Sequence, residues 1–340
     1  MDPWTYYPET LATEGGTQQQ TTWVGVSTIG VVIYILAFLP IWIAIIFGNL
    51  LVIFAFKTDV TLQKSGTNII LYSLAATDLL SGLVGLPLHV IGRVAVTPLT
   101  CSSATRALFF LPGFFFCGLS LGHIFVLAVE RYVAVSRPIT HRRIVSLRRI
   151  KTLLTILWLI LLVNCFLAIL TKILATKDDP DTYNCDNYTI GKGNPAHSYE
   201  IFVSCLILFF FLLMALCYVR IYFIAREILN RRHGDRGDRG DRGDSRKRII
   251  STTSTTAIVV VVCGICWLPT IFKYFCRAYC NYDKRNFLVL FTVCEMVLYS
   301  NSMVNPIIYG YRMPEFRKAY RKVLDRVRSR QTRSSTHNAN

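Results

Sequence analysis

The sequence predicts an all-α membrane protein: a bundle of seven transmembrane helices followed by an amphipathic eighth helix. Three observations support this fold class. Of 340 residues, 53% are hydrophobic and only 17% are charged, a combination that soluble domains rarely show. The apolar residues gather in long blocks. The cationic residues gather in certain segments between those blocks.

Seven apolar blocks are each long enough to cross roughly 30 Å of hydrocarbon as a helix, which takes about 20 residues. In chain order they are Thr28–Phe56, Asn68–Ile91, Ala107–Val135, Thr152–Leu174, Ile201–Ile224, Ile249–Phe275 and Phe287–Tyr309. Buried core helices are the alternative, but so many such blocks in one soluble chain would be exceptional. We therefore predict seven membrane spans.

The Lys and Arg residues of the short loops predict the orientation of the spans. The loops after the third and fifth spans are basic, and so is the tail after Tyr309, whereas the opposite side carries the acidic run DDPD of residues 178–181. We expect an extracellular tail over residues 1–27, a seven-span membrane domain over residues 28–310 and a cytoplasmic helix and tail over residues 311–340. The first span then serves as an uncleaved signal-anchor of a multi-pass plasma-membrane protein.

The formal net charge of +17 reflects this topology and an attraction to the anionic lipids of the inner leaflet. Nucleic-acid binding would need a folded basic surface, which the sequence does not indicate. The stretch HGDRGDRGDRGDSRKR, residues 233–248, repeats the Arg-Gly-Asp tripeptide by which adhesion ligands engage integrins. Because it falls in the third cytoplasmic loop, integrin binding is excluded and a flexible spacer is predicted.

Most of the eleven cysteines lie within spans, where a thiol is a small hydrophobic group. Four lie on the predicted outer side, which is an oxidising compartment: Cys101, Cys185, Cys276 and Cys280. The same side carries a glycosylation sequon, Asn187-Tyr188-Thr189. We therefore predict a glycoprotein that is glycosylated at Asn187.

Polar residues inside spans are costly, so their positions carry information. They are Asn49, Asp78 in LAATDLLSG, Ser120, and Asn301, Ser302 and Asn305 in NSMVNPIIY. A buried carboxylate at Asp78 needs a proton or a cation, and neutral oxygens converging on it would suit a small hard cation. Hydrogen bonds that merely join the helices explain the same residues, and both interpretations stay open.

Three further features lie at predicted helix bends and ends. Glu130-Arg131-Tyr132 closes the third span, although a charged pair at a membrane interface is usually only an anchor. Pro269 in CWLP and Pro306 beside Asn305 each remove a backbone donor and bend their helices. Bent helices around a polar core indicate a protein that switches between two conformations, but transporters also use broken helices.

Six motifs in order carry a family resemblance: GN at Asn49, LAATD at Asp78, ERY at Arg131, Trp158 in the fourth span, CWLP at Trp267 and NPIIY at Tyr309. From about Thr28 to Arg328 the chain resembles the rhodopsin-like (class A) G-protein-coupled receptors. The fifth and seventh spans and the tail are most similar to the adenosine and melanocortin receptors. FRKAYRKVL, from Phe316, resembles the family's amphipathic eighth helix.

The resemblance implies a receptor that transduces binding of an extracellular ligand into activation of a heterotrimeric G protein. It implies a sodium site at Asp78, Ser120, Asn301 and Asn305, supported by Asn49 and capped by Trp267, at which sodium acts as an allosteric modulator. It implies G-protein coupling through the ERY residues Glu130, Arg131 and Tyr132, with Tyr218 and Tyr309 steadying the open form.

Several residues depart from the family pattern. Phe210 replaces a proline and Cys263 a phenylalanine, so the connector that relays ligand binding is atypical. Ile249 stands where many relatives carry an acid that pairs with the arginine. Because only Glu130 then remains to hold Arg131, we predict elevated ligand-free signalling. The family's outer disulfide would join Cys101 to Cys185, and Pro112-Gly113 would loosen the helix between Cys101 and the ERY motif. A second disulfide, Cys276–Cys280, would close a short loop.

Three positions argue against three known ligand classes of the family. Gly113 occupies the place of the aspartate of amine receptors, Tyr299 that of the retinal-linking lysine of opsins, and Tyr274 that of the purine-binding asparagine of adenosine receptors. The candidate pocket residues are His89, Phe110, Phe114, Trp267, Tyr274, Glu295 and Tyr299, although aromatic clusters are more often packing. We expect Glu295 to pair internally with Lys273 or His89, with a cationic ligand as the alternative.

A seven-span transporter is the competing function, but no internal repeat is visible. An enzyme is not expected, because no nucleophile–base set or metal-ligand spacing occurs and the six histidines are scattered. No cofactor beyond the possible sodium ion is expected.

Overall fold

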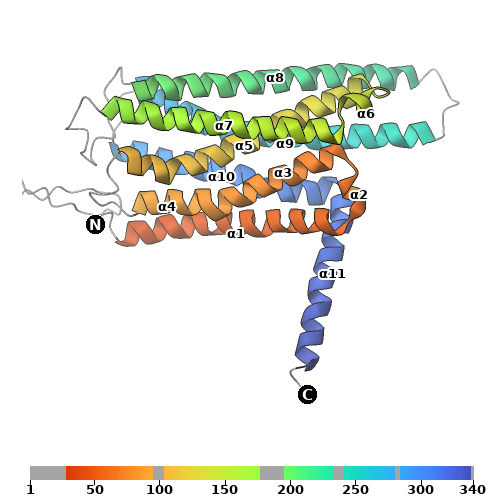
Figure 1. Cartoon of the computed structure of the whole chain (residues 1–340), viewed down its shortest axis with the longest axis horizontal. Coiled ribbons are helices and arrows are strands. Elements are labelled where there is room, and N and C mark those ends of the chain that lie inside the picture. The colour runs from red at the N-terminus through yellow and green to blue at the C-terminus, as the bar shows by residue number, and fades with distance from the viewer. Residues whose placement is uncertain (1–27, 95–102, 177–194, 233–240, 280–283, 338–340) are drawn as a thin grey trace, which may run out of the picture.

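The computed structural model describes residues 28–94, 103–176, 195–232, 241–279 and 284–337. Long helices run side by side through most of this part of the chain (Figure 1). They are α1 (Thr28–Thr58), α5 (Ser103–Ser136), α7 (Leu147–Thr176), α8 (Pro195–Arg232), α9 (Asp241–Tyr279) and α10 (Lys284–Arg312). The second span consists of α3 (Gly66–Leu80), the π-helical turn η1 (Ser81–Gly85) and α4 (Leu86–Val94). The predicted all-α bundle is thus confirmed.

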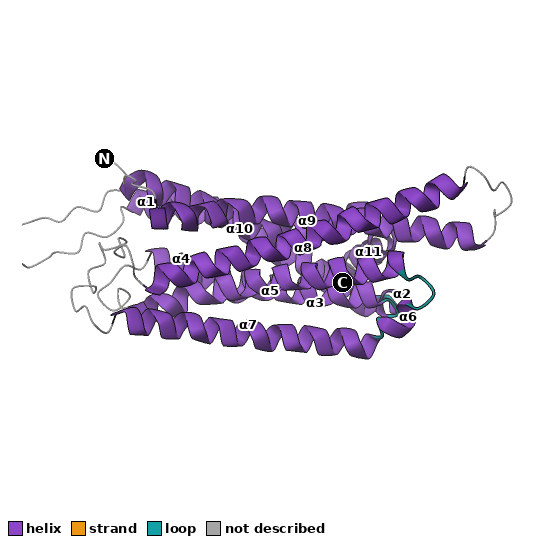
Figure 2. Cartoon of the chain, turned by 90° about the horizontal axis from the view of Figure 1, so that it is seen from above, coloured by secondary structure: helices purple, strands orange, loops and turns teal. Residues whose placement is uncertain are grey.

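The two ends of the bundle differ. The short helices α2 (Val60–Gln63) and α6 (His141–Ile144) lie at one end, where α11 (Pro314–His337) leaves the bundle crosswise (Figures 1 and 2). We call this end the Arg131 end. The opposite end, where α4 lies, is called the His89 end. The crosswise direction of α11 is that expected for an amphipathic helix on a membrane surface.

Six helical segments are long and apolar enough to cross a membrane: Ile29–Thr58, Gly66–Val94, Leu108–Ser136, Leu147–Thr171, Tyr199–Glu227 and Thr252–Cys276. The seventh predicted span is α10, which packs against α9 and α1. It is less apolar because it carries Glu295, Asn301, Ser302 and Asn305. These same polar residues turn inward, since each is at least 97% buried.

Large apolar side chains cover the outside of the bundle as well as its core. Phe166 on α7 is 65% exposed and Phe202 on α8 is 60% exposed. The interior holds a continuous apolar cluster that includes Phe38, Leu74 and Trp267. Apolar residues on both sides of a helix are expected where the outer side faces lipid rather than water.

The sequence did not predict the π-helical turn in the second span. Within it, the carbonyl of Gly82 accepts a hydrogen bond of 2.7 Å from the Trp42 indole of α1. At its end, a Cβ atom on Gly85 would lie 3.0 Å from the Cα atom of Gly113, so two glycines let η1 and α5 approach closely. Turns of this kind often accompany functional sites because they re-aim the following residues.

Some predicted features differ in the structure or fall outside the described residues. α5 continues through Pro112 and Gly113 without a break. α9 begins at Asp241, so residues 241–248 of the predicted flexible loop are helical. Cys276 lies in α9, whereas Cys101, Cys185, Cys280, Asn187, residues 1–27 and residues 233–240 lie outside the described part of the chain. The predicted disulfides and the glycosylation stay predictions.

Candidate functional site

Asp78 of α3 is fully buried inside the bundle. Its carboxylate accepts a hydrogen bond of 2.7 Å from the Ser302 hydroxyl and one of 2.8 Å from the Asn305 amide. Asp78 belongs to α3 and both donors belong to α10, so the carboxylate joins two spans. Ser302 was noted as a polar residue in the sequence but not assigned to the site. Its position one helical turn before Asn305 is the signal that could have placed it there.

Two further amides, of Asn49 on α1 and Asn301 on α10, are also buried. The Asn49 amide donates to the carbonyls of Ile45 at 2.9 Å and Ser302 at 3.1 Å. The Asn301 amide donates to the Ser120 hydroxyl at 3.2 Å. The side-chain carbonyl oxygens of Asn49 and Asn301 are buried without a hydrogen-bond partner in the described structure. Together with the carboxylate, unpartnered oxygens of this type are the ligands that a small hard cation takes.

Trp267 is buried in the apolar cluster that surrounds these polar groups. Its indole nitrogen has no hydrogen-bond partner within the described ranges. The structure therefore joins Asp78 to Asn305 directly and to Asn49 through Ser302, and pairs Asn301 with Ser120. Trp267 lies in the neighbouring core.

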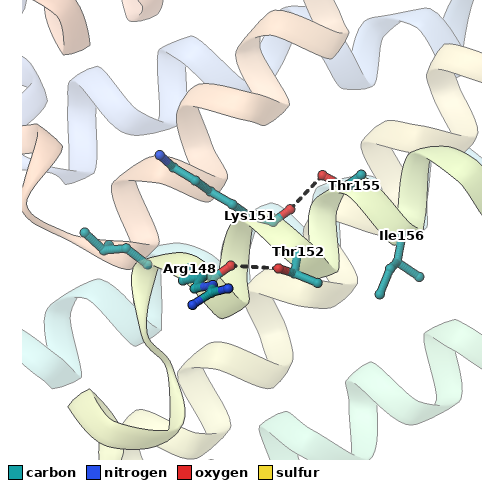
Figure 3. Close-up of a pocket in the computed structure, with 6 residues that line it drawn as sticks. Arg148, Lys151, Thr152, Thr155 and Ile156 are labelled. Carbon is teal, nitrogen blue, oxygen red and sulfur yellow. Dashed lines mark hydrogen bonds between the residues drawn. The ribbon is translucent and has the colours of Figure 1, made fainter.

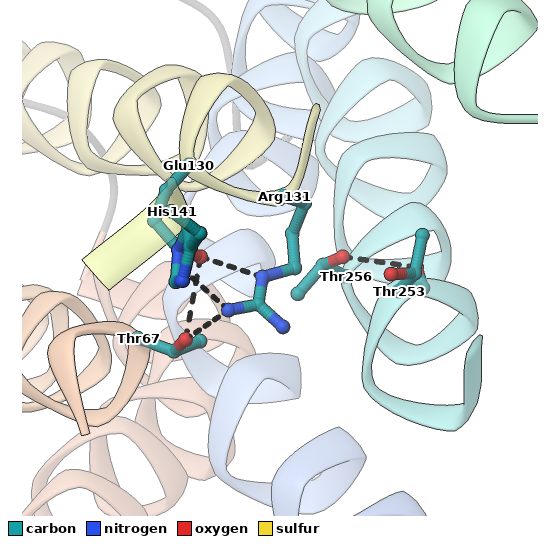
Figure 4. A network of polar contacts seen from close by, with 6 residues as sticks. All are labelled: Thr67, Glu130, Arg131, His141, Thr253 and Thr256. Carbon is teal, nitrogen blue, oxygen red and sulfur yellow. Dashed lines mark hydrogen bonds and ion pairs between the residues drawn. The ribbon is translucent and has the colours of Figure 1, made fainter. Parts of the chain in front are cut away.

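At the Arg131 end, Arg131 and Glu130 form a buried ion pair (Figure 4). The guanidinium donates to both carboxylate oxygens, at 2.5 and 2.6 Å, and to the hydroxyl of Thr67 on α3. The Thr67 hydroxyl also donates to Glu130 at 3.3 Å. His141 of α6 completes the network, with its Nε2 atom 2.9 Å from Glu130.

This network corrects the expectation that Glu130 alone holds Arg131. Thr67 contacts both members of the pair, and His141 fixes the far side of the carboxylate. Within the described part of the chain, the side-chain hydrogen bonds of Arg131 go to residues of α3 and α5, and none goes to α9. Sequence reasoning missed Thr67 and His141 because a threonine in a span and a histidine in a loop are common, and only their contacts with Glu130 single them out.

The three predicted activation tyrosines lie in different surroundings. Tyr309 is buried, and its ring packs against Phe316 of α11 with centroids 5.8 Å apart. Tyr218 of α8 is partly buried against the core, and Tyr132 is partly buried, with its carbonyl accepting a bond from Ser136. Beside them, Arg312 of α10 donates to the Ser254 hydroxyl of α9 at 2.9 Å, so a side-chain hydrogen bond does hold α9 at this end.

At the His89 end, Glu295 of α10 stands among cationic side chains. Its carboxylate lies 2.9 Å from His89 Nε2, accepts bonds of 3.1 and 3.3 Å from Arg93, and lies 3.8 Å from Lys273 Nζ. The expected internal pairing of Glu295 is therefore present. Arg93 was missed, although it lies four residues after His89 and so on the same face of α4.

Aromatic rings enclose this charged group. His89 packs edge-on against the rings of Phe110, at 5.0 Å, and Tyr299, at 5.6 Å. Phe114 lies 6.4 Å from Tyr274, ring centre to ring centre. A narrow cavity, too tight to hold a water molecule in this conformation, is lined by His89, Gly113, Phe114, Glu295, Leu298 and Tyr299. Four of the predicted pocket residues thus line a cavity, two more contact its walls, and Trp267 belongs to the core.

A second hollow, of about 490 Å³, lies on the outer surface of α7 toward the Arg131 end (Figure 3). Leu147, Arg148, Lys151, Thr152, Thr155 and Ile156 line it. The hydroxyls of Thr152 and Thr155 donate to the carbonyls of Arg148 and Lys151, so they belong to the helix's own hydrogen bonding. This surface hollow is separate from the buried sites.

Residues 48–309 match the family described as 7 transmembrane receptor (rhodopsin family). The match covers most of the chain, from just before Asn49 to Tyr309. The chain belongs to the rhodopsin-like seven-transmembrane receptors. The protein is accordingly a G-protein-coupled receptor and a multi-pass membrane protein, and nothing in the structure or the relatives favours a transporter.

Relatives of this receptor support the same conclusion. It is 29% identical over 317 residues to adenosine receptor A2a from Canis lupus familiaris. That alignment covers 88% of this chain and 73% of the relative. It is 29% identical over 311 residues to adenosine receptor A2a from Homo sapiens, covering 86% and 72%. It is 30% identical over 286 residues to the histamine H2 receptor from Rattus norvegicus, covering 82% and 75%. The predicted class A family and its adenosine-like branch are confirmed.

Proposed function

We propose that this receptor binds an extracellular ligand at the His89 end and activates a heterotrimeric G protein at the Arg131 end. In this arrangement the N-terminus lies outside the cell, and α6 and α11 lie in the cytoplasm. The observation that carries the proposal is the buried pair of Arg131 and Glu130, which Thr67 and His141 hold at one mouth of the bundle.

In the resting state of the receptor this ion pair is intact, and activation requires Arg131 to leave Glu130. Arg131 is only 6% exposed, and its charge is satisfied by the Glu130 carboxylate and the Thr67 hydroxyl. Removing one partner from a buried charge is costly, so Arg131 leaves this position only when another partner replaces them. A G protein that enters between α5 and α9 supplies that replacement. Movement of α9 would break the exposed Arg312–Ser254 bond.

Asp78 and its neighbours fit a sodium ion as a modulator of this step. Asp78, Ser120, Asn301 and Asn49 offer one carboxylate, one hydroxyl and two amide oxygens, of which both amide oxygens lack partners among the described residues. A bound sodium ion would neutralise the buried carboxylate. Ser302 and Asn305 keep Asp78 joined to α10, so occupancy of the site would favour the compact resting bundle.

The ligands in the names of the relatives are not proposed as ligands of this receptor. Histamine and adenosine receptors are among them. Gly113 and Tyr274, however, stand where the family resemblance places the amine-binding aspartate and the purine-binding asparagine. We therefore propose neither a histamine-like amine nor adenosine as the ligand.

Nucleotide exchange on purified G proteins tests the coupling function. Full-length receptor in lipid nanodiscs is mixed with each class of heterotrimer, and exchange is compared with that of the G protein alone. We expect faster exchange with at least one class, greater exchange for Thr67→Val, and none above background for Arg131→Ala. Lys322→Gln, an exposed change on α11, is the matched control. Exchange that stays at background for every class, in the wild type and in Thr67→Val alike, would overturn the proposal.

The orientation needs its own test. A reporter fused after Asn340 is expected to resist protease added to intact cells and to be cleaved after permeabilisation. Cleavage in intact cells would place the Arg131 end outside and would exclude coupling there.

A further inference from the structure

Lys273 of α9 is a fully buried cation, with 0% exposure of its side chain. Its ammonium nitrogen makes no hydrogen bond to any residue that the structure describes. Buried polar groups are almost always hydrogen-bonded, and an unbonded buried charge is especially costly. A lysine kept in this position inside a membrane span therefore indicates a partner outside the residues that the structure describes.

Glu295 is an incomplete partner of Lys273, because its carboxylate already contacts His89 and Arg93 and its nearer oxygen lies 3.8 Å from the ammonium nitrogen. One oxygen lies 2.9 Å from His89 and 3.3 Å from Arg93, and the other accepts from Arg93 at 3.1 Å. Lys273 stands 3.8 Å from Glu295, beyond hydrogen-bond length. Within the described ranges, Glu295 carries the only carboxylate within 4 Å of Lys273. Among the described residues, Glu295 is thus the carboxylate that contacts both Arg93 and Lys273.

Another carboxylate, that of Glu200 on α8, adds negative charge only from a greater distance. It lies within electrostatic range of Lys273 but forms no ion pair with it. The immediate surroundings of the ammonium are instead aromatic. Lys273 Nζ lies 3.6 Å from the centre of the Phe291 ring, 4.8 Å from that of Tyr274 and 5.5 Å from that of Phe114. Ring faces attract a cation but use none of its three N–H donors.

The cavity lies against this cationic group. Lys273 contacts two of its lining residues, Glu295 and Phe114, and His89 lines it directly. In this conformation the cavity has no room for even a water molecule. Its lining side chains would therefore move apart to admit a compact polar group, with the remainder of a ligand lying among the aromatic side chains.

The wall of the cavity formed by α5 favours an anion as well. Gly113 lies there, and a Cβ atom at this position would collide with the Tyr299 hydroxyl. No acidic side chain fits at residue 113 unless Tyr299 moves. The cavity therefore has Glu295, already paired, as its single lining carboxylate.

We propose that the ligand of this receptor is an organic acid, whose carboxylate or similar compact anion binds the Lys273 ammonium and the Arg93 guanidinium while an aromatic or apolar part packs on Phe114, Phe291 and Tyr274. This inference rests on the proposed function, in which the His89 end receives the ligand. Glu295 is a positioning residue, because it orients Arg93 and His89 and offsets part of the positive charge. An amine would instead be repelled by Lys273 and Arg93.

Binding is tested apart from signalling, on purified full-length receptor in lipid nanodiscs. Thermal unfolding is measured with three matched sets of probes: phenylacetate, phenylacetamide and phenethylamine; indole-3-acetate, its amide and tryptamine; and nicotinate, nicotinamide and 3-picolylamine. A compound that binds only the folded receptor raises the unfolding temperature. We expect at least one acid to do so and to exceed its own amide and amine.

Variants connect this effect to the proposed residues. Lys273→Gln and Arg93→Gln should each weaken binding of the active acid by on the order of 10- to 100-fold, as loss of a hydrogen bond to a charged group does. Lys273→Arg should keep most of the affinity, since it keeps the charge. Lys322→Gln, which removes an exposed lysine of α11, should leave binding unchanged.

Each contrary outcome has a distinct meaning. Amines that stabilise the receptor as well as or better than their acids, or acids that all fail to stabilise it, would overturn the organic-acid proposal. Inorganic phosphate alone producing the full shift through Lys273 would also overturn it, in favour of an inorganic-anion site. Acid binding without any stimulation of nucleotide exchange would leave this inference standing and would count against the proposed coupling function instead.

Discussion

The His141 imidazole of α6 lies 2.9 Å from a carboxylate oxygen of Glu130, the residue that holds Arg131 on α5. A helix of one turn, outside the bundle, thereby supports the central ion pair of the Arg131 end. His141 is 25% exposed at its side chain, so water and partner proteins can reach it. The loop that contains α6 and the resting position of Arg131 are therefore coupled.

Replacing His141 with Ala is expected to raise ligand-free nucleotide exchange. Glu130 loses a hydrogen bond on its far side, so it holds Arg131 less firmly. A loss of about 1.4 kcal/mol from the resting state corresponds to a tenfold change in the populations of the two states, and we expect an increase up to that size. Thr152→Ala on α7 is the control, because its hydroxyl bonds only the Arg148 carbonyl. An unchanged or lower basal rate would show that α6 does not support the resting state.

Replacing Thr67 with Val is expected to raise basal exchange as well, because Val keeps the shape of Thr but removes the hydroxyl that both Arg131 and Glu130 contact. Since Thr67 and His141 act on the same carboxylate, the double variant should raise exchange by a factor that differs from the product of the two single effects. Strictly independent effects would mean that the two residues do not act through one network.

Replacing Asp78 with Asn is expected to remove the sodium dependence of thermal stability. The wild type should unfold at a higher temperature in sodium chloride than in an equal concentration of choline chloride, because an ion that binds only the folded state stabilises it. Asp78→Asn lacks the carboxylate charge and should give equal unfolding temperatures in the two salts. Ser300→Ala is the control, since its hydroxyl bonds only the Met296 carbonyl on the same helix. A sodium effect that persists in Asp78→Asn would exclude this site.

Replacing Gly113 with Ala is expected to lower the unfolding temperature, because the new Cβ atom meets the Tyr299 hydroxyl. Overpacking of this kind typically costs about 1–3 kcal/mol. Removing the hydroxyl with Tyr299→Phe should restore much of the stability of Gly113→Ala. If the double variant were no more stable than Gly113→Ala, the collision would not be the cause of the loss.

Local patterns in the sequence were enough to predict the helices, because each span is a continuous apolar block and every long block needs a helix to satisfy its backbone in lipid. They failed at the second span, where η1 depends on the fit of Gly85 against Gly113 and of Gly82 against Trp42. The start of α9 at Asp241 was also missed, because the Arg-Gly-Asp repeat has the composition of a flexible loop.

Some residues of the candidate sites could also be predicted from local sequence patterns, and others could not. Asp78, Asn49, Asn301 and Asn305 were predicted together because polar residues inside apolar blocks stand out. Thr67, His141 and Arg93 were not, because a threonine, a loop histidine and an arginine near a span end are common at such positions. Only their contacts with Glu130 and Glu295 distinguish them.

The sequence alone determined that this chain crosses a membrane as a helical bundle with a carboxylate in its middle and an arginine at one end, because apolar length and isolated charge are properties of one segment at a time. Only the tertiary structure decided which groups neutralise those charges. Ion pairing depends on distances between helices, and it left Glu295 fully paired while the Lys273 ammonium stays buried without a hydrogen bond.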